Sequence, residues 1–249
     1  MNFPQIYAII LAAGKGKRMK SDMPKVLHTI AGKPLIDWVL DTVTEAGVSE
    51  IVIVIGHQRK RVVQHLENRS VSNIHFAIQE KLLGTADAVK CALPELPENG
   101  VVFVLCGDVP LIKAQTLKNL LNLHIDTKAA ATILTANLEN PTGYGRIVRA
   151  QDDSVIKIVE HRDATPEELN IKEVNSGTYI FDIECLRRVI NLVDDANDQG
   201  EFYLTDVIQI MQQKGNRISA EVVDDPWEIE GINSRVQMDA MERYLLNRE

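Results

Sequence analysis

Short runs of apolar residues alternate with helix-like segments along the first half of the chain. The apolar runs lie at residues 6–11, 51–55 and 101–105, and each leads into a glycine or a glycine-containing turn. Apolar residues recur at helical spacing in residues 35–43, 62–66, 86–93 and 117–123. Continuous apolar runs of this length are typical of strands buried on both faces. The alternation predicts an α/β fold with right-handed βαβ units, a mainly parallel sheet flanked by helices, and a ligand crevice at the carboxyl ends of the strands.

The pattern changes after Pro141. The segments predicted as short strands are residues 145–149, 155–159 and 174–181, with a polar insertion at 162–170. Helical spacing returns in residues 184–193 and 204–213, and in a last helix from 234 to about 247. This half should therefore make the sheet mixed rather than purely parallel. Because no linker rich in Gly, Ser or Pro interrupts the chain, we expect one continuous domain with two lobes around a cleft.

The composition of the 249 residues is that of an ordinary globular protein, with 45% hydrophobic and 25% charged residues, which argues against disorder and coiled coil. No uncharged apolar run approaches the ~20 residues of a membrane span, and residues 6–13 lack the basic leader of a signal peptide. We therefore expect a cytoplasmic protein. Cys91, Cys106 and Cys185 are odd in number and far apart in sequence, which predicts buried thiols rather than disulfides or a zinc cluster.

The distribution of charge points to a small anionic partner. The formal net charge of −8 argues against a nucleic-acid binder, because such proteins need a basic face to release counterions from phosphate. Residues 15–25 are the exception: they carry five cations against the single acid Asp22. Neither nucleic acid nor a membrane is therefore expected as a partner.

The cations lie in a glycine-containing loop, LAAGKGKRM (11–19), that follows the first predicted strand and is closed by Pro24 and Lys25. Glycines let the backbone N–H groups approach phosphate oxygens, and Lys15, Arg18 and Lys25 can neutralise a triphosphate. The loop has neither the Walker spacing nor the third glycine of a dinucleotide fingerprint. The glycines alone could form a plain strand-to-helix turn, and the cations favour phosphate binding.

A carboxylate, Asp108, follows the apolar run 101–105 and so is expected at the carboxyl edge of the sheet. There it could hold Mg²⁺ beside a triphosphate, or it could cap a following helix. The six histidines have no metal-binding spacing, and no Ser-His-Asp order with a nucleophile elbow occurs. Covalent catalysis therefore has no support.

Further motifs follow in order along the chain. They are QEKLLGTA (79–86), CGDVPL (106–111), NPTGYGRI (140–147), EHRDAT (160–165), EVNSG (173–177) and EGIN (230–233). With the first loop they resemble the sugar-nucleotide pyrophosphorylases and, in their order, the uridylyltransferase domain of the bacterial GlmU family. The resemblance extends from Ile6 to the last predicted helix. Lys17 departs from it, since threonine is usual at that position.

The resemblance implies a Rossmann-like nucleotidyltransferase fold and a reaction. UMP would pass from UTP to N-acetylglucosamine-1-phosphate by in-line attack assisted by Mg²⁺, giving UDP-N-acetylglucosamine and pyrophosphate for peptidoglycan and lipopolysaccharide precursors. It also implies a uridylyltransferase domain at 1–233, with a nucleotide-binding lobe at about 1–110 and a sugar-binding lobe at about 111–233. Residues 234–249 would be a connecting helix. The hexapeptide-repeat acetyltransferase domain of that family is not found in this sequence, and a trimer would require it.

The resemblance also assigns site residues. It places Arg18 and Lys25 in catalysis, and Asp108 and Asn233 on Mg²⁺. The residues implied around the nucleotide are Leu11, Ala12, Ala13, Gly14, Lys25, Gln79, Gly84 and Thr85. Those implied around the sugar are Tyr144, Gly145, Glu160, Asn175, Thr178 and Asn233. A glutamine amide can complement the uracil edge, which makes Gln79 chemically suitable.

Local alternatives exist for several of these residues. Gln79 and Glu160 could be solvated surface groups, and Asn233 could cap the last helix. The rival functions are thymidylyl-, guanylyl- or cytidylyltransferases of the same fold and a non-catalytic nucleotide-binding module. A nicotinamide-dependent oxidoreductase is disfavoured, because the third glycine and the acidic ribose anchor are missing.

Overall fold

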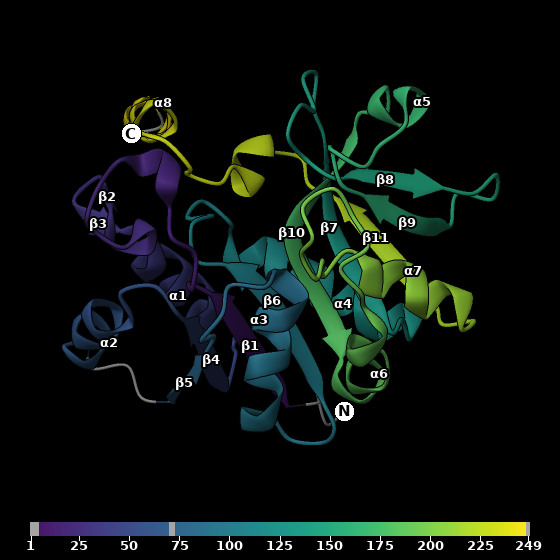
Figure 1. Cartoon of the computed structure of the whole chain (residues 1–249), viewed down its shortest axis with the longest axis horizontal. Helices are drawn as coiled ribbons and strands as arrows, with labels where there is room; N and C mark the ends of the chain where they lie inside the picture. Colours follow the sequence, from purple (N-terminus) through teal and green to yellow (C-terminus); the bar gives the residue numbers. More distant parts are fainter. Residues whose placement is uncertain (1–4, 70–72, 248–249) are drawn as a thin grey trace.

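The described part of the chain forms a nine-stranded mixed sheet with helices on both faces (Figure 1). The computed structural model describes residues 5–69 and 73–247. The main strand order is β11-β7-β10-β6-β1-β4-β5, and β8 and β9 extend from β10. The strands are β1 (Ile6–Leu11), β4 (Glu50–Ile55), β5 (Ile74–Ile78), β6 (Val101–Cys106), β7 (Ala131–Asn137), β8 (Arg146–Arg149), β9 (Val155–Val159), β10 (Glu173–Asp182) and β11 (Ile218–Val222), and a separate hairpin holds β2 (Thr29–Ile30) and β3 (Lys33–Pro34).

The direction of the strands confirms the predicted mainly parallel, mixed sheet. Strands β5, β4, β1 and β6 are parallel to one another, as are β11 and β7. Only β10 interrupts this part of the order, because it runs antiparallel to both β6 and β7. Strands from both predicted lobes thus belong to one sheet, and the boundary near residue 110 stays a prediction.

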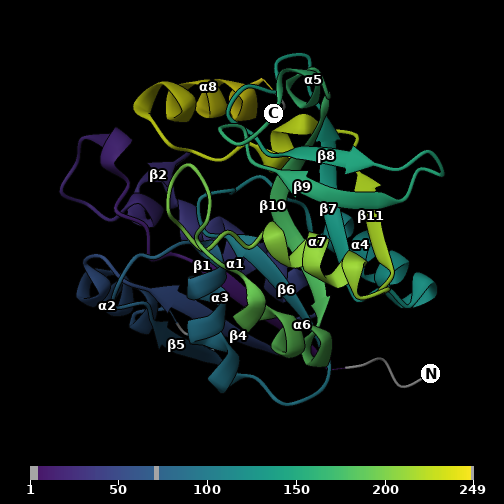
Figure 2. The ribbon, with the colours of Figure 1, turned by 45° about the vertical axis from the view of Figure 1, so that its right-hand side comes forward.

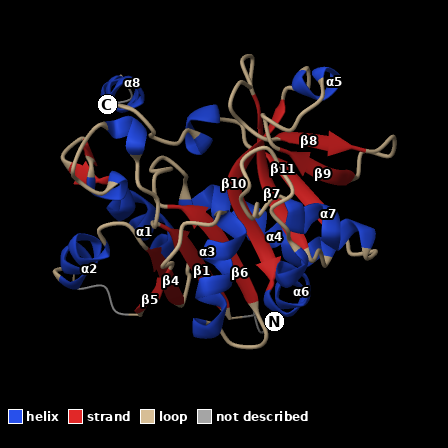
Figure 3. Ribbon diagram, in the orientation of Figure 1, coloured by secondary structure: helices blue, strands red, loops and turns tan. Residues whose placement is uncertain are grey.

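Two layers of helices cover the sheet (Figure 3). The helices are α1 (Leu35–Glu45), α2 (Arg59–Glu67), α3 (Thr85–Ala92), α4 (Ala114–Thr127), α5 (Pro166–Leu169), α6 (Ile183–Val189), α7 (Asp206–Gln213) and α8 (Arg235–Leu246). Helices α3, α6 and α7 share one buried cluster, and α1, α2 and α4 share another. Residues of β1 alternate between them, since Ile9 lies in the first cluster and Ile10 in the second. The period of two along each strand therefore fills both cores.

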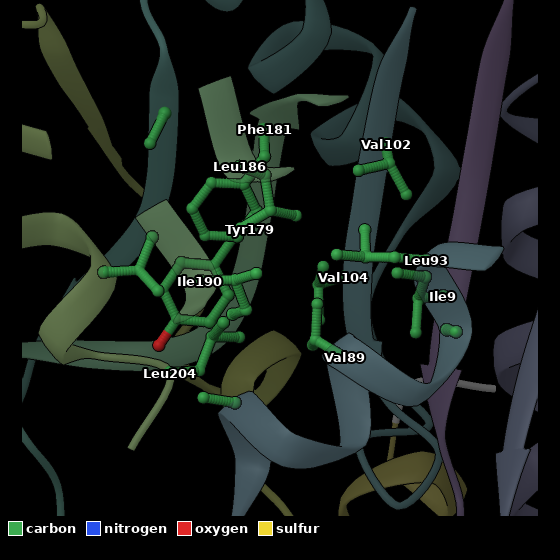
Figure 4. Close-up of a cluster of buried hydrophobic side chains, with 14 of the residues drawn as sticks. Ile9, Val89, Leu93, Val102, Val104, Tyr179, Phe181, Leu186, Ile190 and Leu204 are labelled. Carbon is green, nitrogen blue, oxygen red and sulfur yellow. The ribbon is translucent and has the colours of Figure 1, made fainter. Parts of the chain in front are cut away.

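The first cluster lies between α3, α6 and the strands β1, β6 and β10 (Figure 4). Val102 and Val104 of β6 and Phe181 of β10 are fully or almost fully buried there. The side chain of Tyr179 also lies in this cluster, although it carries a polar hydroxyl. These contacts support the pairing of β6 with β10. They thereby position the residues that follow β6 and those at the register shift within β10.

The last helix packs against the segment that follows the glycine-containing loop. Met241 of α8 and Met19 of that loop are both buried in a third cluster, together with Ile30, Leu35 and Ile232. Figure 2 shows α8 above the β2 region, away from the N-terminus. The helix predicted as a connection therefore also supports the loop. No helix within the described ranges is long and apolar enough to cross a membrane.

Candidate active site

The turns that follow β1, β4, β5 and β6 meet at the carboxyl edge of the sheet. Backbone hydrogen bonds join them: Gly107 N donates to Leu11 O (3.0 Å), His57 N to Ala13 O (3.1 Å) and Gln79 N to Ile55 O (2.9 Å). Since parallel strands end on the same side, this edge is where a ligand crevice is expected. A cavity of about 550 Å³ lies there.

The cavity brings together every residue predicted for the nucleotide, for catalysis and for the metal. It is lined by Leu11, Ala12, Ala13, Gly14, Arg18, Lys25, Gln79, Gly84, Thr85, Asp108 and Asn233. Lys15, Gly16, Val26, Leu82, Ala88, Cys106 and Glu201 complete the lining. Burial raises the pKa of the Cys106 thiol to about 12, so it is a neutral wall group rather than a thiolate nucleophile.

Two glycines allow the loops to come this close. Gly16 has φ 58°, and a Cβ at this residue would lie 2.8 Å from the Cβ of Lys25. A Cβ at Gly56 would lie 3.0 Å from that of Ala13 and 3.1 Å from the Gln79 carbonyl oxygen. Glycine is therefore needed where Lys25 enters the cavity and where the first loop approaches Gln79.

Lys25 lies between the two predicted metal ligands. Its ammonium forms an ion pair with Asp108 and donates to Asn233 Oδ1 (2.6 Å), although these two residues are 125 positions apart. A carboxylate oxygen and an amide oxygen thus converge on one cation, and these are donors that suit Mg²⁺. Among the described residues no group of three or more His, Cys, Asp or Glu could hold a metal ion. Mg²⁺ in proteins usually keeps waters and phosphate oxygens beside one or two protein ligands.

The alternative of a helix cap is wrong for both residues. Helix α4 begins at Ala114, well after Asp108. The cap of α8 is Ser234, whose hydroxyl accepts from Gln237 N (3.3 Å). Asp108 and Asn233 are therefore available to the cavity.

One wall of the cavity was not predicted from the sequence. Phe202 N donates to Leu83 O (2.8 Å), Ala86 N donates to Phe202 O (2.9 Å), and Leu204 N donates to Thr85 Oγ1 (2.9 Å). This segment lies directly against Gly84 and brings Glu201 into the lining. The sequence held a signal for it, GEFYLTD (200–206), where a glycine and two adjacent aromatic residues interrupt a polar stretch.

The residues predicted for the sugar lie outside the lining of this cavity and form a neighbouring group, with the exception of Asn233. Asn175 N donates to Gly145 O (2.9 Å), and Asn175 Nδ2 donates to the Tyr179 hydroxyl (2.6 Å). The register of β10 shifts between these two residues, and Cys106 Sγ lies 3.9 Å from the Gly177 oxygen in the shifted segment. The group therefore adjoins the cavity wall.

The other members of this group are held by further polar contacts. Thr205 Oγ1 donates to Glu160 Oε1 (3.1 Å), and burial raises the pKa of the Glu160 carboxyl. The Tyr144 hydroxyl donates to Glu230 Oε2 (2.7 Å), while Thr178 is buried. Thr205, which was not predicted, connects Glu160 to the segment that forms the cavity wall.

Comparison with known proteins shows the family to which the sequence is similar. The family model described as nucleotidyl transferase matches residues 7–228. The bifunctional protein GlmU of Thermoanaerobacter pseudethanolicus is 46% identical over 243 residues, and that of Clostridium beijerinckii is 49% identical over 242. These matches cover 98% and 97% of this chain and 52% of each relative. The chain thus spans about half the length of these curated relatives.

Solved structures share the fold at low sequence identity. A UDP-glucose pyrophosphorylase complexed with UDP-glucose superimposes with a TM-score of 0.79 at 18% identity, covering 98% of this chain and 99% of the other. A putative glucose-1-phosphate thymidylyltransferase from Bacillus anthracis gives a TM-score of 0.79 at 19% identity, covering 96% and 94%. These likenesses confirm the predicted Rossmann-like α/β fold. The family match over residues 7–228 shows that this chain belongs to the nucleotidyl transferase family.

Proposed function

We propose that the chain transfers UMP from UTP to N-acetylglucosamine-1-phosphate, giving UDP-N-acetylglucosamine and pyrophosphate. One observation carries the proposal: a single cavity gathers a cationic glycine-containing loop, a buried glutamine amide, and the oxygens of Asp108 and Asn233. These are groups for a triphosphate, for a base edge and for a divalent cation. The identity to bifunctional GlmU proteins over nearly the whole chain supports the choice of substrates. The reaction would serve cell-wall precursor synthesis in the cytoplasm.

The proposed reaction needs no nucleophile from the protein. A phosphate oxygen of the sugar phosphate attacks the α-phosphorus of UTP, the new O–P bond forms, and the α–β bridging bond breaks to release pyrophosphate. The protein has to orient two anions and neutralise their charge. Lys25 and Arg18 line the cavity and would act on the phosphates.

Asp108 and Asn233 would hold Mg²⁺, with phosphate oxygens and waters as its other ligands. When bound there, the ion would supply positive charge to the reacting phosphates. Lys25 contacts both ligands, so its ammonium is close enough to share in the same task.

The sugar would occupy the neighbouring group. Glu160 and Asn175 can accept from and donate to sugar hydroxyls or the acetamido group, and Gly145 can offer its backbone N–H. Tyr144 and Thr178 are assigned to the same side, and Asn233, which lines the nucleotide cavity, would contact the sugar as well. Because the shifted segment of β10 adjoins the cavity wall, a sugar phosphate held there would reach the nucleotide.

The decisive experiment measures pyrophosphate release from UTP with and without N-acetylglucosamine-1-phosphate and Mg²⁺. We expect release only when all three are present. The other nucleoside triphosphates and glucose-1-phosphate, tested in parallel, separate this activity from relatives with another base or sugar specificity. If the chain binds UTP but releases no pyrophosphate with either sugar phosphate, it is a non-catalytic binding module and the proposal is contradicted.

A further inference from the structure

The side chain of Gln79 is held by two acceptors. It follows β5, is 4% exposed and lines the cavity. Its Nε2 donates to Gly84 O (3.0 Å) and to Asp87 Oδ2 (2.8 Å). Asp87 lies in the first turn of α3, where the free N–H groups of the helix favour a negative charge.

These partners decide which way the amide faces. The oxygen and nitrogen of a glutamine amide have nearly the same shape, so its orientation follows from its neighbours. A backbone carbonyl and a carboxylate can only accept, and the NH₂ group must therefore face them. Both of its N–H bonds are then used. Within residues 5–69 and 73–247 the Oε1 atom has no hydrogen-bond partner, so an acceptor is what Gln79 offers to the cavity.

We propose that Asp87 determines base selectivity by locking Gln79 in this orientation. This inference rests on the proposed function, in which the cavity holds a nucleoside triphosphate. An acceptor at this position pairs with a base edge that presents a donor, as uracil does at N3–H. Cytosine has an acceptor at N3, so both groups would be left unpaired in a desolvated site.

Turning the amide over would not rescue cytosine while Asp87 is present. The flip would direct Oε1 at the Asp87 carboxylate and the Gly84 carbonyl, replacing two hydrogen bonds with contacts between acceptors. Without the carboxylate only Gly84 O opposes the flip. Asp87 is thus a positioning residue, which acts on the base through Gln79.

The test compares Asp87→Asn with the parent protein. Asparagine keeps the shape but can either donate or accept, so only Gly84 O still opposes the turning of the Gln79 amide. We expect the ratio of kcat/KM for UTP to that for CTP to fall about tenfold or more, since a hydrogen bond to a charged group contributes about that factor. The change should come mainly from KM, because the phosphate chemistry is untouched.

Two controls separate positioning from general damage. Glu80→Gln removes the same charge from the residue beside Gln79, but Glu80 is exposed and pairs with Arg59 (2.7 Å), so the ratio should stay unchanged. In a Gln79→Ala background, Asp87→Asn should produce no further change in the ratio, because the group that it positions is gone.

Two outcomes would overturn the inference. Equal losses for UTP and CTP in Asp87→Asn would make Asp87 a structural residue only, and an altered ratio in the Gln79→Ala background would show that it acts without Gln79. Calorimetric titration of UTP and CTP into each variant measures the corresponding ratio of dissociation constants, which needs no turnover. A protein that binds UTP but releases no pyrophosphate would refute the proposed function, and the binding ratio would still decide the role of Asp87.

Discussion

Replacing Gly84 with alanine would test the wall that the segment around Phe202 forms on the cavity. Gly84 has φ 127° and ψ 178°, a conformation that is essentially restricted to glycine. A Cβ built on it would lie 2.6 Å from Phe202 N, 2.9 Å from Phe202 C and closer still to Phe202 O. These are backbone atoms, so the contact cannot be relieved by a side-chain rotation.

The cost can be worked from the bonds that must break. If the segment moves away, the three hydrogen bonds of Phe202 N, Ala86 N and Leu204 N are lost, at about 1 kcal/mol each. The backbone conformation costs a further ~1–3 kcal/mol for a residue with a Cβ. We therefore expect the free energy of unfolding to fall by roughly 4–6 kcal/mol, a large share of the ~5–15 kcal/mol typical of a folded protein.

Urea unfolding with matched variants would measure this. Gly47→Ala is the control, because Gly47 also has a positive φ (90°) but a Cβ there meets nothing within 4 Å. Both alanines would have to adopt a positive φ, so a stability difference of about 3 kcal/mol or more between the variants reports the contact with the Phe202 segment. UTP binding should be lost only in Gly84→Ala. Equal stability of the two variants, with UTP binding intact in both, would refute the reasoning.

Three further predictions concern the loop, the metal ligand and the acidic group beside the wall. Gly14→Ala should change the free energy of unfolding by less than about 1 kcal/mol, since the added Cβ meets no protein atom within 4 Å. The Cβ would extend into the cavity that the loop lines, so UTP binding should weaken at least about tenfold in calorimetry, and an unchanged affinity would contradict the prediction. Asp108→Asn should lower kcat roughly a hundredfold or more. The protein should stay folded with only a modest fall in melting temperature, because Asp108 caps no helix and the variant loses one ion pair, that with Lys25; near-normal, Mg²⁺-dependent turnover would remove Asp108 from the metal site. Burial and the neighbouring Asp194 and Asp163 raise the pKa of Asp206 from 3.8 to about 6, so its contribution to stability is complete below pH 3.8 and is lost as the pH rises through 6. Asp206→Asn should therefore be more stable than the parent protein at pH 7.5 and nearly equal at pH 4 in urea unfolding, and an equal gap at both values would exclude this titration.

The local pattern of the first half of the chain predicted three of its strands closely, but it did not predict β5 or the hairpin of β2 and β3. Residues 6–11 form β1 without change, and the segments at 51–55 and 101–105 each differ from β4 and β6 by one residue. The reason is physical, because strands covered by helices on both faces must be apolar at every position. Helices that cover them must keep one apolar stripe.

The strands that went unpredicted carry weaker local patterns. Strand β7 consists mostly of alanine and threonine, and its Thr132 and Thr135 are fully buried. Each has a polar partner elsewhere in the chain: Thr132 Oγ1 lies 2.9 Å from His124 Nδ1, and Thr135 Oγ1 donates to Glu173 Oε1 (2.8 Å). A threonine can be central in a sheet when its hydroxyl is paired, and a local pattern does not reveal the partner.

The sequence by itself determined the α/β class, the cationic loop for an anion and the polar residues that follow the strands, because these depend on neighbours within a few positions. Only the tertiary structure decided how these groups act together. It placed Lys25 between Asp108 and Asn233, and it set the segment at Phe202 against Gly84. Such contacts join residues far apart in the sequence, 208 positions in the case of Lys25 and Asn233, so they depend on strand order and loop closure. Hydrogen-bond direction likewise requires knowing every partner, and this is why the orientation of the glutamine amide in the cavity emerged only from the folded chain.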